Sequence, residues 1–266
     1  MNDQSITSAK LYWLIENISQ YEKVAVAYSG GIDSSLLLYA AKTALGAGNV
    51  VALTLISSVV PTYAVQNCRT LLKESIFNGI SHREILVNPF EWDDFTKNSG
   101  DRCYFCKKRM YLTLIDSMKN SPFFILFDGT NVDDTKEDRP GRKAVQELNV
   151  KTPLLEAGLR KNEIRILAKK VGLSNYDLPS NSCLATRIPT GMCIKEEMLN
   201  RIDQAESFLV REGFSGCRVK PYESYTVIEV QASQMKDVIR PENRNRIKEF
   251  FASLNFLAVA LSLKHR

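Results

Sequence analysis

The residues best suited to chemistry lie at positions 29–35, where the chain reads SGGIDSS directly after the apolar run 24–28. A strand, a tight glycine turn and a helix start, in that order, aim backbone N–H groups and the positive end of a helix dipole at one point. Such a point suits a polyphosphate. The competing interpretation is an ordinary strand-to-helix turn with a Ser or Asp N-cap. The adjacent glycines, with Ser before them and Asp-Ser after them, favour an anion-binding loop.

Two common phosphate loops do not match this pattern. A P-loop requires G-x-x-x-x-G-K-[ST], and no Lys follows these glycines; a dinucleotide fingerprint requires separated glycines, and these are adjacent. The order S-G-G-x-D-S resembles the pyrophosphate loop of the ATP pyrophosphatases, which split ATP between its α and β phosphates while adenylating a substrate. The resemblance implies that Asp33 acts through Mg²⁺ or fixes the loop. It also implies phosphate contacts from the amides of Gly30 and Gly31 and from the hydroxyls of Ser29, Ser34 and Ser35.

A second candidate centre is the pair Cys103 and Cys106, which stands between Arg102 and the basic run 107–109 at an expected helix start. The helix dipole and the nearby cations favour a thiolate there. A zinc ribbon requires a second C-x-x-C pair, and a thioredoxin-type pair should follow the first strand; neither condition holds. A soft metal site completed by a distant cysteine, with Cys183 as the candidate, and a pair of buried or idle thiols both stay open.

Composition sets the class of protein. The chain has 266 residues, with 35 Lys and Arg against 30 Asp and Glu, and this mild excess does not by itself indicate nucleic acid. The N-terminus is polar, and the apolar run 256–263 is too short to cross a bilayer, so we expect it to form a buried strand. We therefore expect a cytoplasmic protein with reduced cysteines, of which Cys68, Cys193 and Cys217 serve as small core residues.

The elements that must position these residues alternate between strands and helices. Strands are expected at 23–28, 50–56, 83–87 and 123–127, and helices at 5–20, 34–45, 62–77, 103–119 and 161–171, with a polar loop at 88–101 and a short edge strand at 152–155. This alternation predicts an α/β fold, with a doubly wound and mostly parallel sheet. Ligands of such sheets bind at the carboxyl ends of the strands, where the 29–35 loop would lie.

A second polar cluster, DGTNVDD at 128–134, follows the strand expected at 123–127. Taken alone, it is equally a turn rich in Gly, Asn and Asp. Next to the first loop in one sheet, it becomes a candidate part of the same site.

The C-terminal part of the chain has a different pattern. A long amphipathic helix at 196–211, strands at 217–220 and 225–230, a helix at 240–251 and the final apolar strand predict a smaller α+β domain. We place the boundary in the irregular segment before that helix, which gives a domain at 1–188 that contains the 29–35 loop and a smaller domain at 189–266.

The order of motifs resembles the LarE family of ATP-dependent sulfurtransferases. Most of the chain takes part, through SGGIDSS at 29–35, DRCYFCK at 101–107, GTNVDD at 129–134, RPG at 139–141, PLLEAGL at 153–159 and CLATRIP at 183–189. The resemblance implies an adenine nucleotide alpha hydrolase-like fold and a homo-oligomer, with an ATP pyrophosphatase domain at 1–188 and a sulfur-transfer or substrate-binding domain at 189–266. It also implies a reaction in which ATP adenylates a carboxylate of a pyridinium dicarboxylate mononucleotide, and a sulfur nucleophile then displaces AMP to leave a thiocarboxylate for a nickel-pincer cofactor.

The resemblance further implies roles for individual residues. Cys183 is either a sacrificed sulfur donor or, with Cys103 and Cys106, a ligand of a [4Fe–4S] cluster that carries an added sulfide; the three cysteines favour the cluster class. Contacts to ATP are implied for Gly129, Asn131, Asp133 and Arg187, and Asp133 with Asp134 would serve Mg²⁺ or ribose or cap the next segment. Substrate contacts are implied for Glu206, Arg218 and Glu229.

The chain departs from the family at 223–230, where it reads ES and then TVIEV in place of a His-Gly turn and Ala-Arg-Ile-Glu-Val. This departure bears on the substrate more than on adenylation. Partners implied are the mononucleotide and a source of sulfide, without nucleic acid or membrane. The alternatives are a tRNA thiolase, disfavoured by the modest charge, and a non-catalytic nucleotide-binding or iron–sulfur protein, favoured by the altered segment.

Overall fold

The computed structural model describes residues 3–123, 125–135, 140–179, 181–256 and 258–264. The chain forms two compact units. The first contains residues 1–57, 64–88 and 101–178, and the second contains 58–63, 89–100 and 179–266. In this division by contacts, the C-terminal part of the second unit begins at residue 179. The domain boundary proposed from the sequence lies at residue 188.

The first unit is built on a parallel sheet. Its described strands are β1 (Val24–Ala27), β2 (Val50–Ile56), β3 (Ser81–Leu86) and β4 (Leu126–Phe127), in the order β3-β2-β1-β4. All three pairings are parallel, and Val24 of β1 is opposite Val50 of β2. The chain therefore builds outward from β1 in one direction through β2 and β3, and then returns to add β4 on the other side. The predicted doubly wound α/β fold is confirmed.

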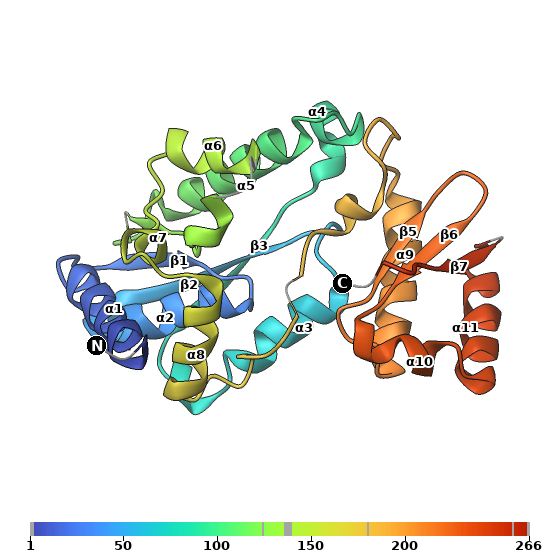
Figure 1. Ribbon diagram of the computed structural model, residues 1–266. Helices are drawn as coiled ribbons and strands as arrows, with labels where there is room; N and C mark the ends of the chain where they lie inside the picture. The colour runs from blue at the N-terminus through green and yellow to red at the C-terminus, as the bar shows by residue number, and fades with distance from the viewer. Residues whose placement is uncertain (1–2, 124, 136–139, 180, 257, 265–266) are drawn as a thin grey trace. The chain divides into compact units, whose positions relative to one another are not determined.

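Helices cover both faces of this sheet, as Figure 1 shows. Buried side chains of α1 (Asp3–Ile18), α2 (Ile32–Leu45) and α8 (Lys161–Val171) pack with Val24 and Val26 in one apolar cluster. The other cluster contains Ala25 together with side chains of α5 (Arg102–Met118) and α6 (Pro140–Glu147). Because alternate residues of a strand point to opposite faces, the unbroken apolar run of β1 supplies both clusters.

Two elements of the first unit differ from the prediction. The helix expected at 62–77 is α3 (Thr62–Leu71), followed by the 3₁₀ turn η2 (Ser75–Phe77). The edge strand expected at 152–155 is wrong, because the short helix α7 (Pro153–Glu156) occupies this segment, with Pro153 at its first position. Proline has no N–H to give to a sheet but suits the first turn of a helix, so only Lys151 pairs with Phe127. The remaining described turns are η1 (Ala47–Asn49) and η4 (Val132–Thr135).

The second unit is the α+β fold that the sequence predicts. The helices α9 (Glu196–Arg211), α10 (Met235–Val238) and α11 (Pro241–Ser253) accompany a described sheet of order β5-β6-β7. In this sheet β5 (Arg218–Pro221) is antiparallel to β6 (Thr226–Glu229), and β6 is parallel to β7 (Val259–Leu261). Short helical turns complete the unit: η3 (Pro89–Glu91), α4 (Asp93–Thr96), η5 (Leu184–Arg187) and η6 (Ala232–Gln234).

Two expectations about the second unit are wrong. The polar loop at 88–101 contains η3 and α4, where Phe95 is buried. The final strand is an edge strand with exposed residues, and Val259 keeps 38% of its surface exposed. Phe124 in the expected strand 123–127 and Arg139 in the RPG motif lie outside the described residues, as do Leu257 in the run 256–263 and His265. In the part of the chain that the structure describes, no helix has the length and apolar character that crossing a membrane requires.

Candidate nucleotide site and cysteine segments

The loop at 29–35 joins the carboxyl end of β1 to the start of α2. Gly30 has φ of +70°, and a Cβ there would lie 2.9 Å from Cα of Cys68, so this position needs glycine for both conformation and space. Gly31 precedes the helix, and no side chain caps the α2 N-terminus. An uncapped N-terminus presents N–H groups and the positive end of the dipole, which is the arrangement that holds phosphate.

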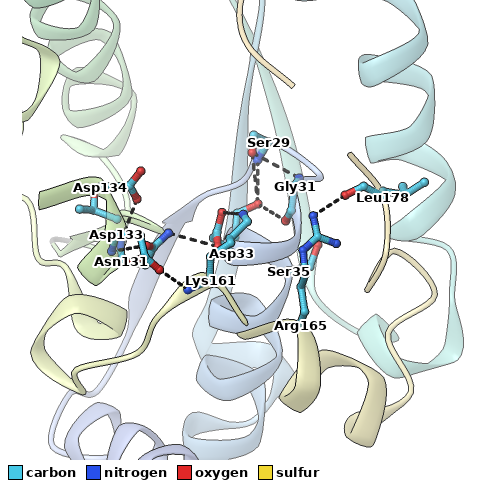
Figure 2. Close-up of polar contacts among 12 residues, drawn as sticks. Ser29, Gly31, Asp33, Ser35, Asn131, Asp133, Asp134, Lys161, Arg165 and Leu178 are labelled. Carbon is cyan, nitrogen blue, oxygen red and sulfur yellow. Dashed lines mark hydrogen bonds and ion pairs between the residues drawn. The ribbon is translucent and has the colours of Figure 1, made fainter. Parts of the chain in front are cut away.

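The three serines of the loop differ in their surroundings, and Figure 2 labels Ser29 and Ser35 beside Gly31 and Asp33. Ser29 is exposed, and its Oγ lies 3.3 Å from Oγ of Ser34. The Ser34 hydroxyl donates to the Gly31 carbonyl at 2.9 Å. Ser35 is fully buried, and its Oγ accepts from Asn175 Nδ2 at 2.9 Å. Ser29 is therefore the hydroxyl best placed for a phosphate. Ser35 supports the loop through its buried hydrogen bond with Asn175.

The segment that follows β4 lies against the same helix start. β1 and β4 are adjacent, and the chain order reverses between them, which is the switch point where doubly wound sheets bind ligands. A Cβ on Gly129 would lie 3.1 Å from the Ser34 nitrogen, so glycine permits the close approach. Asn131, which is buried, donates from Nδ2 to Oδ1 of Asp33 at 3.4 Å. The structure thus brings together the two polar clusters that the sequence predicts separately.

Lys161 is a site residue that the sequence analysis missed. It is the first residue of α8, and its ammonium pairs with Asp33 of the loop (Figure 2). Its backbone N–H donates to Oδ2 of Asp133 at 2.8 Å, so Asp133 holds the N-terminus of α8. Burial raises the pKa of the Asp33 carboxyl, and the charge of Lys161 opposes this rise. The signal in the sequence was a lysine at the start of an amphipathic helix, which surface helices also show.

Asp134 also has a local contact. Its Oδ2 accepts from the Asn131 backbone N–H at 3.0 Å, while the Asp133 N–H donates to Asn131 Oδ1 at 2.9 Å. Among the uses considered from the sequence, capping therefore has direct contacts in the structure. Roles toward Mg²⁺ or ribose stay predictions.

Asp128, the first residue after β4, links this loop to α5. Its carboxylate accepts from the Thr130 N–H at 2.7 Å and from the hydroxyls of Tyr111 and Thr130, and it lies 3.5 Å from Lys107 Nζ. Burial would raise the pKa of Asp128, but the charge of Lys107 and these hydrogen bonds together hold it below its usual value. Burial and the same carboxylate raise the pKa of Tyr111.

Cys103 and Cys106 lie in the first turns of α5, in the first unit. Both are partly exposed, and a separation of three residues puts them on one side of the helix. The Arg102 guanidinium donates to Cys103 Sγ at 3.4 Å, and Cys106 Sγ lies 3.9 Å from Met110 Sδ. These are accessible thiols beside a cation, which disfavours the buried-thiol interpretation.

Cys183 lies in the second unit, at the residue before η5. It is partly exposed, and its carbonyl accepts from Thr186 Oγ1 at 2.7 Å and from Arg187 Nη1 at 3.3 Å. Arg187 is buried, and it donates from Nε and Nη2 to the two oxygens of Glu206 at 2.7 and 3.0 Å. Nη1 also donates to Ser182 Oγ at 2.6 Å. Arg187 therefore fixes the backbone around Cys183, and these contacts do not favour the phosphate contact expected of it.

The residues expected at the substrate are engaged within the second unit. Glu206 is fully buried, and besides Arg187 it accepts from the Val219 N–H at 2.9 Å. Arg218 of β5 is opposite Glu229 of β6, and Glu229 pairs with Lys220 at 2.5 Å.

The three cysteines expected in the core differ in burial. Cys68 and Cys217 are buried as predicted, whereas the prediction for Cys193 is wrong, because Cys193 is exposed.

Comparisons with known proteins show what the chain is similar to. Residues 9–90, which run from α1 to just beyond β3 and contain the 29–35 loop, match the NAD synthase family model. An uncharacterised protein of Synechocystis is 31% identical over 254 residues, covering 94% of this chain and 93% of its own. The pyridinium-3,5-bisthiocarboxylic acid mononucleotide synthase of Lactiplantibacillus plantarum is 28% identical over 250 residues, covering 94% and 89%. The chain belongs to the LarE family of ATP-dependent sulfurtransferases. An uncharacterised relative from Methanocaldococcus jannaschii, 29% identical over 247 residues, covers 91% of this LarE-family chain and 90% of its own.

For this LarE-family chain, the side chains present can be compared with the metal cluster and the nucleotide that the resemblance implies. Within the described residues, no three His, Cys, Asp or Glu side chains form a group that could hold a metal ion. Cys103 and Cys106 are nevertheless soft, accessible ligands of the kind that iron–sulfur clusters use. The uncapped α2 start, with Ser29 and Lys161 beside it, has the donor chemistry for a nucleotide phosphate.

Proposed function

We propose that this protein uses ATP to adenylate a carboxylate of a pyridinium dicarboxylate mononucleotide and then exchanges the activated oxygen for sulfur. The observation that carries the proposal is the meeting of the 29–35 loop with the segment after β4 at the switch point of the sheet, through the Asn131–Asp33 hydrogen bond. The substrate class comes from the named Lactiplantibacillus relative, which matches along nearly its whole length.

The residues of the loop have separable tasks. The α2 N-terminus and Ser29 bind the phosphates that leave as pyrophosphate, and Lys161 neutralises charge that develops on them. Asn131 and Lys161 hold Asp33 between the two segments. Asp33 either takes up Mg²⁺ or keeps the loop in shape. AMP is a far better leaving group than hydroxide, and a thiolate is a strong nucleophile near neutral pH, so adenylation makes sulfur transfer feasible.

The cysteines supply or carry the sulfur. In the proposed cluster form, Cys103, Cys106 and Cys183 would hold a [4Fe–4S] cluster, which would supply a bound sulfide as nucleophile. In the sacrificial form, Cys183 gives up its own sulfur. The Arg187 hydrogen bonds fix the Cys183 carbonyl in either case, and therefore the direction in which its side chain leaves the backbone.

The first test is ATP-dependent release of pyrophosphate with the pyridinium mononucleotide, followed by mass spectrometry of the nucleotide product. We expect one pyrophosphate for each oxygen replaced by sulfur, and loss of both signals in Asp33→Asn. Asn17→Asp is the matched control, because Asn17 is a partly exposed α1 residue whose described side-chain contact is with Glu156. Pyrophosphate release that needs tRNA, and not the mononucleotide, would contradict the proposal and support a tRNA thiolase.

The sulfur source is tested separately on protein purified without oxygen. Iron and acid-labile sulfide in equal amounts, lost in both Cys103→Ala and Cys183→Ala, support the cluster. Absence of iron, together with loss of one sulfur atom from Cys183 after turnover, supports sacrifice of that cysteine.

A further inference from the structure

The second unit contains a pocket that the proposed function does not use. Its volume is about 500 Å³, within the range of ligand pockets, and it lies between the β6–β7 end of the sheet and the helices α10 and α11. Ile228, Ile247 and Phe256 are buried in its walls. Ile239, also in the lining, keeps 59% of its surface exposed, so the pocket opens to one side through an apolar rim.

One wall of this pocket is the outer edge of the sheet, as far as the structure describes the chain. β7 is the last strand in the order β5-β6-β7, and it bonds to β6 through Ala258 and Ser262. The backbone groups of Val259 and Leu261 therefore face away from β6, as the outward groups of an edge strand do. All of residues 258–261 line the pocket. Because alternate side chains point to opposite faces of a strand, the pocket must extend around the edge of β7.

Two cations line this otherwise apolar pocket, Arg244 and Lys248 of α11. Their neighbours have counter-charges: Arg240 pairs with Asp237 at 2.8 Å, and Arg246 pairs with Glu212 at 2.7 Å. No carboxylate partner is described for Arg244 or Lys248 in the part of the chain that the structure covers. The pocket thus combines apolar walls, free strand edge and unbalanced positive charge.

We propose that this pocket and the edge of β7 form a docking site for an extended, acidic segment of another protein. The segment adds a strand beside β7, seats an apolar side chain in the pocket and places its carboxylates on Arg244 and Lys248. Backbone hydrogen bonds supply affinity, and the pocket and the two cations supply specificity. A second copy of this chain is a poorer occupant, because its own β7 segment, FLAVALSLK at 256–264, has no carboxylate to place on Arg244 and Lys248.

The test uses two fluorescein-labelled peptides, Glu-Val-Leu-Val-Glu and its charge-reversed form Lys-Val-Leu-Val-Lys, and measures binding to the full-length protein by fluorescence anisotropy. We expect the acidic peptide to bind the wild type at least about tenfold more tightly than the basic one, as the loss of opposite charges in a binding site predicts. The double variant Arg244→Glu/Lys248→Glu should reverse this preference. Both cations are exposed, so the variant should unfold at the wild-type temperature.

Strand addition has its own pair of variants. Val259→Pro removes an outward N–H and should weaken binding of the acidic peptide about tenfold, whereas Val259→Thr keeps the N–H and the branched shape and should bind like wild type. Circular dichroism confirms that both are folded. Equal binding of the two peptides, or equal binding by the Pro and Thr variants, would overturn the proposal.

Other occupants give other results. If the unliganded double variant sediments differently from the wild type, a second copy occupies the pocket and the proposal is wrong. If decanoate binds with the same charge dependence while neither peptide binds, the pocket is a small-molecule site, and the proposal is again wrong. None of these measurements depends on sulfur transfer, so they fail or succeed independently of the proposed function.

Discussion

Arg187 and Glu206 form a buried bidentate ion pair, with Nε to Oε1 at 2.7 Å and Nη2 to Oε2 at 3.0 Å, and their side chains are 1% and 0% exposed. Such a pair is strongly destabilising to break, because the remaining charge stays buried without a partner. We expect Glu206→Gln to lower the free energy of unfolding by about 3–5 kcal/mol in urea titrations. The control is Glu229→Gln, which breaks the more exposed pair with Lys220 and should cost about 1 kcal/mol. Equal losses in the two variants would contradict this account.

A substitution at Gly30 separates backbone strain from steric conflict. Gly30 and Gly158 have similar angles, with φ of +70° and +64°, but a Cβ on Gly158 meets nothing within 4 Å, while a Cβ on Gly30 meets Cys68 at 2.9 Å. Gly158→Ala should therefore cost only the left-handed strain of about 1–2 kcal/mol. Gly30→Ala should cost more and should also abolish ATP binding, measured by calorimetry. A Gly30→Ala protein that binds ATP normally would show that the loop tolerates displacement.

Removal of the Lys161 ammonium should slow the adenylation step. Because this cation pairs with Asp33 at the loop, we expect Lys161→Met to lower the rate of pyrophosphate release roughly hundredfold, the usual effect of losing one group that stabilises developing charge. Lys10→Met is the control, since Lys10 pairs with Glu163 on the same helix without touching the loop. If both variants lose activity equally, the effect belongs to the packing of α8.

Asp128 should make the first unit sensitive to acid. Its folded pKa is below the ordinary value, so its contribution to stability is full above about pH 4 and is lost as the pH falls through the folded pKa. The difference in unfolding free energy between the wild type and Asp128→Asn should therefore shrink below about pH 4. A difference that stays constant from neutral pH down to acid would show that Asp128 acts through hydrogen bonds alone.

The cysteines should differ in reactivity according to burial. Cys193 is exposed and should be the first to react with iodoacetamide in native protein at mildly alkaline pH. Cys68 should be protected, because burial raises its pKa to about 11, as should the buried Cys217. Mass spectrometry of peptides after timed labelling measures the order. Early labelling of Cys68 would mean that the 29–35 loop, in which Gly30 lies against Cys68, opens.

Periodicity was sufficient for the main elements, because each long element carries its own pattern. β2, α8 and α9 begin and end at the predicted residues. The strand expected at 152–155 failed because its apolar residues fit a helical turn equally well, and Pro153 decides between the two. The loop after β4 was predicted, but not its contact with Asp33, since such a contact depends on how distant strands are ordered.

The roles of charged residues were harder to predict. Lys161 and Arg187 are both basic residues with no local pattern that tells their roles apart, yet one reaches the nucleotide loop and the other is buried with Glu206. The sequence does not show which carboxylate lies within reach. Burial of a pair of opposite charges therefore has no local signal, and the phosphate contact expected of Arg187 was drawn from resemblance alone.

The second unit takes residues 58–63 and 89–100 from the middle of the first, and this has a consequence for synthesis and for engineering. Val59 and Phe95, each 1% exposed, reach their final surroundings only when the segment from 179 onward has left the ribosome. The Val59 carbonyl, for example, accepts from the Leu184 N–H at 2.8 Å. A nascent chain that stops at residue 178 therefore lacks part of the packing that buries Val59 and Phe95. No single cut separates the units, and a partner for gene fusion is better placed at a terminus than between them.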